Sequence, residues 1–188
     1  MLILKRKLFN ILEILLRWIP ISKKIVLFLS FDGQFNDNPL YIYEELIKRN
    51  HKMKFIWLIS SNSIYEKSFF RSTKNTKFVK IHSLRHLYYS RRAKVIIDNG
   101  AGYKTIISGS KKTRLYRLFK KRKQLNISTW HGTPMKKIGI NIPNIKTEVL
   151  FTTSDYLLSG SRYTTTIFKE SFPFKGMKII ETGTPRTD

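Results

Sequence analysis

The part of the chain best suited to chemistry is residues 130–137, with the sequence WHGTPMKK. Histidine is the side chain that ordinarily changes charge around neutral pH, and the glycine, threonine and two lysines beside it suit an anionic ligand. The run follows a strand-like apolar stretch, so we predict a turn from strand into helix, with Thr133 as the cap and Pro134 as the first helical residue. Free backbone amides at a helix start bind anions, which favours a phosphorylated ligand.

His131 is the candidate general base of such a site. A base in this position accepts a proton from a substrate hydroxyl and typically contributes about 10² to 10⁴ in rate. The structural alternative is that the ring only bonds a backbone carbonyl at the turn. Gly132 and Thr133 would offer backbone amides to a phosphate. Lys136 and Lys137 would add positive charge, although only one of two adjacent helical lysines faces the ligand.

Three polar residues in other loops are candidates for the same site. Asn38 either caps the helix that follows it or contacts the ligand. Asn99 either makes the turn that an Asn-Gly pair favours or bonds a substrate hydroxyl. Arg186, within the final run GTPRTD, either contacts a phosphate or pairs with Asp188.

The rest of the chain predicts the scaffold that brings these loops together. Short β-branched and aromatic runs alternate with helical runs, which is typical of βαβ units and a largely parallel sheet. We expect strands at residues 24–31, 53–59, 77–81, 94–98, 125–130, 156–159 and 177–181, and helices at 38–49, 83–92 and 161–170. The predicted class is α/β, a Rossmann-like sheet with helices on both faces. In such sheets ligands bind outside the carboxyl ends of the strands, where the candidate residues fall.

The composition indicates one globular domain with an anionic partner. A chain of 188 residues with 41% hydrophobic residues can bury a full core, and 36 basic against 12 acidic residues give a net charge of +24. The chain has no cysteine, which excludes disulfides and thiolate metal sites. His82 and His86 have helical i, i+4 spacing but no third ligand nearby, so no metal site is predicted.

Residues 1–20 predict an amphipathic helix that ends at Pro20 and precedes a single domain at residues 21–188. Charges recur along the helix, so we expect it to lie on a membrane surface and not to cross the bilayer. The residues expected to bind anionic lipid are Lys5, Arg6, Lys7, Arg17, Trp18, Lys23 and Lys24. The alternatives are a helix packed on the protein's own core and a signal peptide, although no small-residue cleavage site follows Pro20.

A second basic segment spans residues 104–123. Its nine charges come without any acidic residue, and they are Lys104, Lys111, Lys112, Arg114, Arg117, Lys120, Lys121, Arg122 and Lys123. The segment docks on an anionic membrane, guides a polyanionic polymer, or is a solvated loop in a lysine-rich chain.

Three motifs occur in one order along the chain: residues 31–39 (FDGQFNDNP), residues 130–136 (WHGTPMK) and residues 183–188 (GTPRTD). Together they resemble the CDP-glycerol glycerophosphotransferase family, over nearly all of the chain. The resemblance implies the N-terminal, acceptor half of a two-domain glycosyltransferase-B fold, with His131 in a catalytic role. It also implies a second, nucleotide-binding half with another important histidine, which is absent from these 188 residues.

The activity that this resemblance implies is transfer of glycerol phosphate from CDP-glycerol to a lipid-linked or polymeric acceptor in teichoic acid synthesis, at the cytoplasmic face of the bacterial membrane. A glycerol hydroxyl would attack the β-phosphorus and CMP would leave, so the protein mainly positions groups and neutralises charge. The implied partners are anionic membrane lipids, a teichoic acid acceptor and the missing nucleotide-binding half. CDP-glycerol is the donor substrate, and no cofactor is expected.

The alternative function is a non-catalytic basic module that binds anionic membrane or nucleic acid, which the net charge of +24 favours. Tyrosines near the charges suit base stacking, among them Tyr88, Tyr89, Tyr103 and Tyr116. The sequence contains no helix-turn-helix, RNP, KH or zinc pattern, which argues against nucleic acid.

Overall fold

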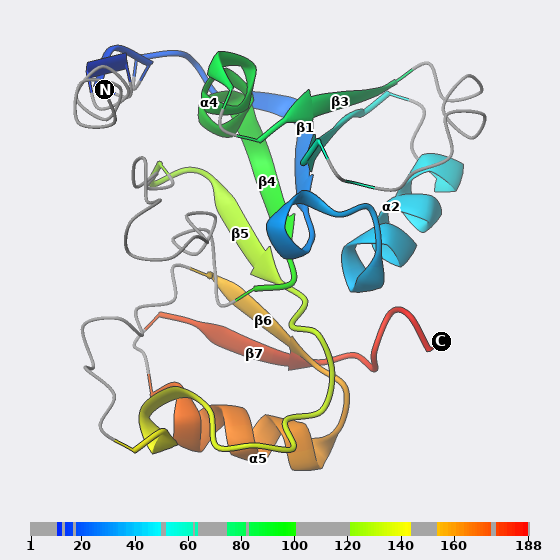
Figure 1. Ribbon diagram of the computed structural model, residues 1–188, viewed down its shortest axis with the longest axis vertical. Helices are drawn as coiled ribbons and strands as arrows, with labels where there is room; N and C mark the ends of the chain where they lie inside the picture. The colour runs from blue at the N-terminus through cyan, green and yellow to red at the C-terminus, as the bar shows by residue number, and fades with distance from the viewer. Residues whose placement is uncertain are drawn as a thin grey trace.

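The computed structural model describes residues 11–187 except 13, 17, 50–51, 62, 64–74, 82, 101–120, 144–153 and 174–175. Within these residues the core is a seven-stranded parallel sheet in the order β3-β2-β1-β4-β5-β6-β7 (Figure 1). The strands are β1 (Ser22–Leu29), β2 (Lys54–Ile59), β3 (Thr76–Lys80), β4 (Ala93–Asp98), β5 (Leu125–Ser128), β6 (Tyr156–Ser159) and β7 (Lys178–Glu181). The predicted α/β class and all seven predicted strands are confirmed.

The strand order reverses between β1 and β4. The first three strands are added in one direction, and the chain then crosses back to add β4 to β7 on the other side of β1. A reversal of this kind leaves a crevice outside the carboxyl ends of the two strands, because the connections leave them in opposite directions.

Three α-helices have the positions that the sequence predicts: α2 (Asp37–Arg49), α4 (Leu84–Arg92) and α5 (Arg162–Ser171). Local capping explains two of the starts. Ser83 Oγ accepts a hydrogen bond from the backbone N–H of His86 at 3.1 Å, and Ser161 Oγ accepts one from the N–H of Thr164 at 3.2 Å. The described parts of the connecting loops include the 3-10 turns η1 (Phe31–Gly33) and η3 (Gly139–Asn141).

The helices cover both faces of the sheet, as predicted. On one face, Leu87 of α4 packs with Leu27 in an aliphatic cluster. On the other face, Tyr43 of α2 meets the ring of Phe28 edge-on, and that ring stacks on Trp57 with centroids 5.1 Å apart. Each such fully buried side chain contributes on the order of 1.5–3 kcal/mol, so the sheet gives its loops a rigid frame.

The helix predicted to start at Pro134 is wrong. Residues 133–138 are irregular and lead into η3. The reason lies at Gly139, whose φ is +58° and whose backbone passes so close to α5 that an added Cβ would stand 2.0 Å from the carbonyl oxygen of Ser171. A helix limited to residues 134–138 is too short to be stable on its own. The segment after Pro134 therefore supplies no helix start to the anion site, and Thr133 has no helix to cap.

The N-terminal segment is helical at residues 11–12 and 14–16 and contacts the domain through one face. Leu12 and Leu16 are half-buried against the aliphatic cluster beneath α4. The exposed apolar side chains of the other face, here called the apolar stripe, are Ile11, Ile14, Leu15 and Trp18. Packing on the protein's own core is thus confirmed for one face of this helix. No helix in the described part of the chain is long and apolar enough to cross a membrane.

Lys121 fastens the end of this segment to the domain, because its Nζ donates a hydrogen bond to the carbonyl oxygen of Ile19. Burial, together with the positive charge of Arg91, lowers the pKa of that lysine. Several predicted anion-binding residues lie outside the described residues, namely Lys5, Arg6, Lys7, Arg17 and the basic segment up to residue 120. Those that are described and exposed include Trp18, Lys23 and Lys24.

Candidate functional site

The loops after β1, β4 and β5 lie at the carboxyl ends of these strands, where the strand order reverses (Figure 1). Hydrogen bonds join His131 to Asn99 and Arg186 to Asn38 there. The loop after β1 leads through η1 to α2, and the loop after β4 begins at Asn99. The loop after β5 contains His131. The segment after β7 returns to the same edge and brings Arg186 to the start of α2.

Trp130 holds the His131 ring at this edge. Its φ of +53° is unusual for a residue other than glycine and turns the chain sharply after β5. The indole is 8% exposed and packs against Phe168 and Phe172 at centroid distances of 5.3 and 5.5 Å. The imidazole stacks on this indole at 4.5 Å and meets the ring of Phe31 at 5.5 Å. The ring is therefore held from two sides while the residue remains exposed.

The hydrogen bond of His131 determines its tautomer. Nδ1 lies 3.0 Å from the backbone carbonyl oxygen of Asn99. Because a carbonyl oxygen only accepts, Nδ1 carries the hydrogen, and the lone pair of the neutral ring is on Nε2. The sequence suggested either a structural hydrogen bond or a general base for His131, and this geometry is compatible with both. The ring bonds a carbonyl at a turn, and the same bond leaves Nε2 in the form that a general base requires.

The side chain of Asn99 fixes the carbonyl that holds the imidazole. The amide is 2% exposed, and its Oδ1 accepts a hydrogen bond from the N–H of Phe31 at 3.1 Å. Its Nδ2 donates to Ser30 Oγ at 3.0 Å and to Asp37 Oδ2 at 2.6 Å. The predicted contact with a substrate hydroxyl is wrong, because the side chain is buried and donates its hydrogens to the loop after β1.

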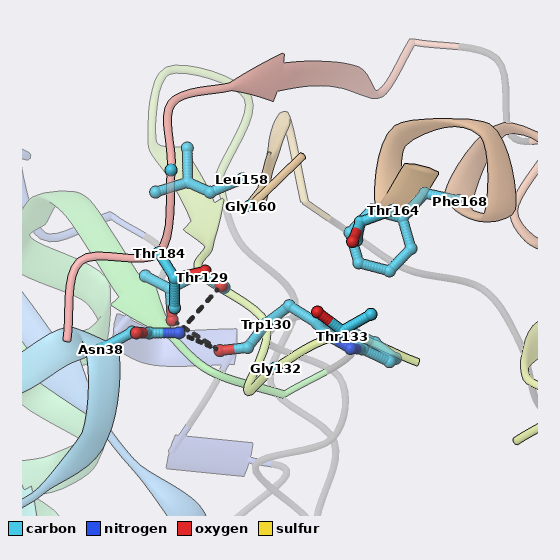
Figure 2. Close-up of a pocket in the computed structure, with 11 residues that line it drawn as sticks. Asn38, Thr129, Trp130, Gly132, Thr133, Leu158, Gly160, Thr164, Phe168 and Thr184 are labelled. Carbon is cyan, nitrogen blue, oxygen red and sulfur yellow. Dashed lines mark hydrogen bonds between the residues drawn. The ribbon is translucent and has the colours of Figure 1, made fainter. Parts of the chain in front are cut away.

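Asn38 also links segments, and the prediction that it caps the following helix is wrong. It lies inside α2, which begins at Asp37. It is 1% exposed and belongs to the lining of the pocket in Figure 2, so its contact with a ligand stays a prediction. Its Nδ2 donates to the carbonyl oxygens of Thr129 and Trp130 at 3.3 and 3.1 Å (Figure 2). Its Oδ1 accepts from the backbone N–H of Arg186 at 3.2 Å. One buried amide thus aligns α2, the loop after β5 and the segment after β7.

Arg186 pairs with Asp37, and the predicted partner Asp188 lies outside the described residues. Its Nη1 is 2.9 Å from the carboxylate, which is 4% exposed, whereas the arginine side chain is 43% exposed. The Nη2 atom lies against Gly132, where an added Cβ would be 3.3 Å away. A fixed guanidinium therefore stands beside the residue that follows His131, with one side open to solvent.

A shallow pocket opens beside this cluster (Figure 2). It lies between the loop after β5, α5 and the segment after β7. Gly132 lies in its lining, and the threonines that also line it are Thr129, Thr133, Thr164 and Thr184. Gly160 permits the close packing here, because a Cβ on it would stand 2.4 Å from Thr184 Oγ1. Gly132 and Thr133 therefore line a pocket from an irregular loop instead of a helix, and their contact with a phosphate stays a prediction.

Lys136 and Lys137 lie apart from this pocket. Both are exposed and line a neighbouring groove with Tyr163 and Glu170 of α5. Because residues 133–138 are not helical, the argument that only one of the two faces a ligand no longer applies. Among the described residues, no group of three His, Cys, Asp or Glu side chains is placed to hold a metal ion.

Sequence reasoning missed Asp37 and Phe31 as parts of the site. A carboxylate such as that of Asp37 is not expected in an anion site. Its role as the counter-ion of Arg186 depends on a contact between residues 149 positions apart. The available signal was the first motif, residues 31–39, which contains both residues next to a predicted strand end.

Fold and site together define a Rossmann-like α/β domain of the glycosyltransferase-B type with a histidine at the strand-order reversal. The chain belongs to the CDP-glycerol:poly(glycerophosphate) glycerophosphotransferase family, which matches residues 11–188.

Curated relatives and solved structures share this assignment. The chain is 33% identical to a teichoic acid glycerol-phosphate transferase of Staphylococcus aureus (strain NCTC 8325 / PS 47), over 89% of this chain and 42% of the relative. It is 30% identical to a teichoic acid poly(glycerol phosphate) polymerase of Bacillus spizizenii (strain ATCC 23059 / NRRL B-14472 / W23), over 97% of this chain and 46% of the relative. The structure of the wall teichoic acid polymerase TagF matches with a TM-score of 0.70 and 26% identity, over 97% of this chain and 43% of that one. The chain thus spans less than half the length of these relatives.

Proposed function

We propose that this chain forms the acceptor-side half of an enzyme that transfers glycerol phosphate from CDP-glycerol to a glycerol-phosphate acceptor in teichoic acid synthesis. The observation that carries the proposal is the geometry of His131, whose Nδ1 is bound to the Asn99 carbonyl so that Nε2 is left as the basic nitrogen. The family match and the names of the relatives give the chemistry that this base would serve.

In the proposed reaction the acceptor hydroxyl gives its proton to Nε2 of His131. The hydroxyl oxygen forms a bond to the β-phosphorus of CDP-glycerol as the bond from that phosphorus to the bridging oxygen breaks, so CMP leaves with that oxygen. Little covalent chemistry is required of the protein, and the main contributions are position and charge neutralisation.

Arg186 is the cation that this reaction needs near the base. Its guanidinium keeps donors for phosphate oxygens because Asp37 engages Nη1, while Nη2 stands beside Gly132. The positive φ values of Trp130 (+53°) and Gly132 (+138°) lie beside the base, as expected where strain fixes a reactive geometry. The groove that contains Lys136 and Lys137 would hold phosphates farther along a polymeric acceptor.

The test of this proposal is release of CMP. The full-length protein, incubated with CDP-glycerol, is expected to release CMP only when a glycerol-phosphate acceptor is added, because His131 acts on the acceptor hydroxyl. A protein that binds duplex DNA with a steep loss of affinity in salt, and that releases no CMP with any acceptor, would be the non-catalytic basic module instead.

We further propose that residues 1–20 place the domain of residues 21–188 on the cytoplasmic face of the bacterial membrane as a peripheral protein. The support is the apolar stripe, whose members recur at i, i+3, i+4 and i+7 and are 55% to 88% exposed. Trp18 suits the lipid interface, and Lys23 and Lys24 are exposed next to it. Leu12 and Leu16 anchor the same helix to the domain, so the stripe has a fixed direction.

Replacing Leu15 with glutamine is expected to lower the binding of the protein to phosphatidylglycerol vesicles by about tenfold, because a leucine inserted into lipid contributes about 1.5–3 kcal/mol. Leu84→Gln is the matched control, since Leu84 is 61% exposed on α4 and Leu15 is 62% exposed. Vesicle co-sedimentation measures both. Equal binding by the two variants would remove the apolar stripe from the contact.

A further inference from the structure

A second pocket lies at the amino-terminal edge of the sheet. It offers about 860 Å³ of solvent-open space between the starts of β1, β2 and β3 and the end of α4. Its charged and aromatic lining is Lys24, Lys54, Lys77, Tyr88, Tyr89 and Arg92. The eight residues of β1 rise about 3.3 Å each, so roughly 25 Å separate this pocket from the edge that carries His131. The proposed transfer reaction does not use this pocket.

The strand register explains how two of the lysines come together. Lys54 is the neighbour of Ile25 on β1, and Lys77 is the neighbour of Ile56 on β2. Both isoleucines belong to the aliphatic cluster beneath α4, so the alternation of side chains places Lys54 and Lys77 on that same face. The pocket lies where α4 ends at Arg92.

Arg92 is held in position by aromatic side chains. Its Nη1 donates a hydrogen bond to the hydroxyl of Tyr88 at 2.7 Å, and its guanidinium carbon lies 5.6 Å from the centre of that ring. The Tyr88 ring in turn meets Tyr89 edge-on at 5.2 Å. The Nε of Arg92 is buried and has no hydrogen-bond partner among the described residues. A buried donor of this kind is costly unless a ligand or water satisfies it.

The charges in this pocket are not balanced. Among the described residues no carboxylate lines it, and none of Lys24, Lys54 and Lys77 forms an ion pair with an acidic side chain. Like charges held in one pocket repel each other and lower stability until an anion binds.

Lysines on a sheet edge have another explanation, because they prevent pairing with other chains. This explanation covers Lys77, since β3 is an edge strand. It does not cover Lys54, because β2 is paired with both β1 and β3. The position of Lys54 therefore favours a ligand.

We propose that this pocket binds a phosphate-bearing ligand, either a soluble glycerol-phosphate ester or the headgroup of an anionic phospholipid. The lysines supply point charges, and Arg92 supplies a planar guanidinium that suits two phosphate oxygens. The hydroxyl of Tyr88 accepts from Arg92 and so keeps its own hydrogen to donate.

The test compares two double variants that each remove two exposed charges. Lys54→Gln with Lys77→Gln empties the pocket of two cations, whereas Lys80→Gln with Lys169→Gln removes lysines outside it. The probes are glycerol 3-phosphate, measured by titration calorimetry, and phosphatidylglycerol vesicles, measured by co-sedimentation. The pocket variant is expected to bind at least one probe about tenfold more weakly than the native chain, and the control variant is expected to bind as the native chain does.

The two probes separate the two sources of phosphate. Weaker binding of glycerol 3-phosphate identifies a soluble ester, and weaker binding of vesicles alone identifies a lipid headgroup. Equal binding by the two double variants with both probes, or no binding of either probe by the native chain, would overturn the proposal. Circular dichroism checks that each variant is folded. Because binding and not CMP release is measured, the outcome does not depend on the proposed transfer.

Discussion

Replacing His131 with alanine is expected to reduce acceptor-dependent CMP release by about 10² to 10⁴-fold, the usual contribution of a general base. The expected change is in kcat, with KM for the acceptor little altered, because Arg186 and the backbone of Gly132 remain in place. Steady-state kinetics with the acceptor concentration varied measure both kcat and KM.

The matched control for this variant is Lys169→Gln, an exposed change on α5. It should leave kcat at its native value. If His131→Ala kept the native kcat, Nε2 would have no part in the reaction, and the hydrogen bond to Asn99 would be structural only.

Replacing Gly139 with alanine is expected to destabilise the domain by about 3 kcal/mol or more, from a strained positive φ and from overpacking. The new Cβ would stand 2.0 Å from the carbonyl oxygen of Ser171 and 2.9 Å from the ring of Phe172. Both belong to the end of α5, and Phe172 packs on Trp130. Thermal unfolding should show a melting temperature lower by about 6–12 °C, at about 2–4 °C per kcal/mol for a chain of this size.

Substitution of Gly176 separates backbone strain from overpacking. Its φ is +91°, yet an added Cβ would meet nothing within 4 Å. Gly176→Ala therefore reports the backbone strain alone, about 1–2 kcal/mol. Equal losses of stability in the two variants would show that the contact between Gly139 and α5 contributes nothing.

The sheet could be predicted from sequence because buried parallel strands are continuous apolar runs. Residues 25–29 and 55–59 are such runs, and every one of their residues is buried. The helix starts at Ser83 and Ser161 were predictable for a similar reason, since a capping hydroxyl acts on an amide three residues away. Local signals were sufficient for both.

The details of the site were not predictable in this way, because they depend on contacts between distant parts of the chain. The hydrogen bond from Arg186 to Asn38 joins residues 148 positions apart, and that from Asn99 to Asp37 joins residues 62 apart. Thr133 and Pro134 had the sequence of a helix start, but the packing of Gly139 on α5 prevents the helix. Residue type indicated which loops matter, and tertiary packing determined what each side chain does.

The imidazole of His131 takes its orientation from an oxygen that no genetic change can delete, because every amino acid at position 99 would bring a main-chain carbonyl with it. A substitution there can act only by displacing that oxygen, through loss of the hydrogen bonds that the Asn99 side chain makes with Phe31, Ser30 and Asp37. Substitutions at position 99 should therefore lower activity by degrees, according to how far the carbonyl oxygen is displaced, whereas any substitution at position 131 removes the imidazole itself.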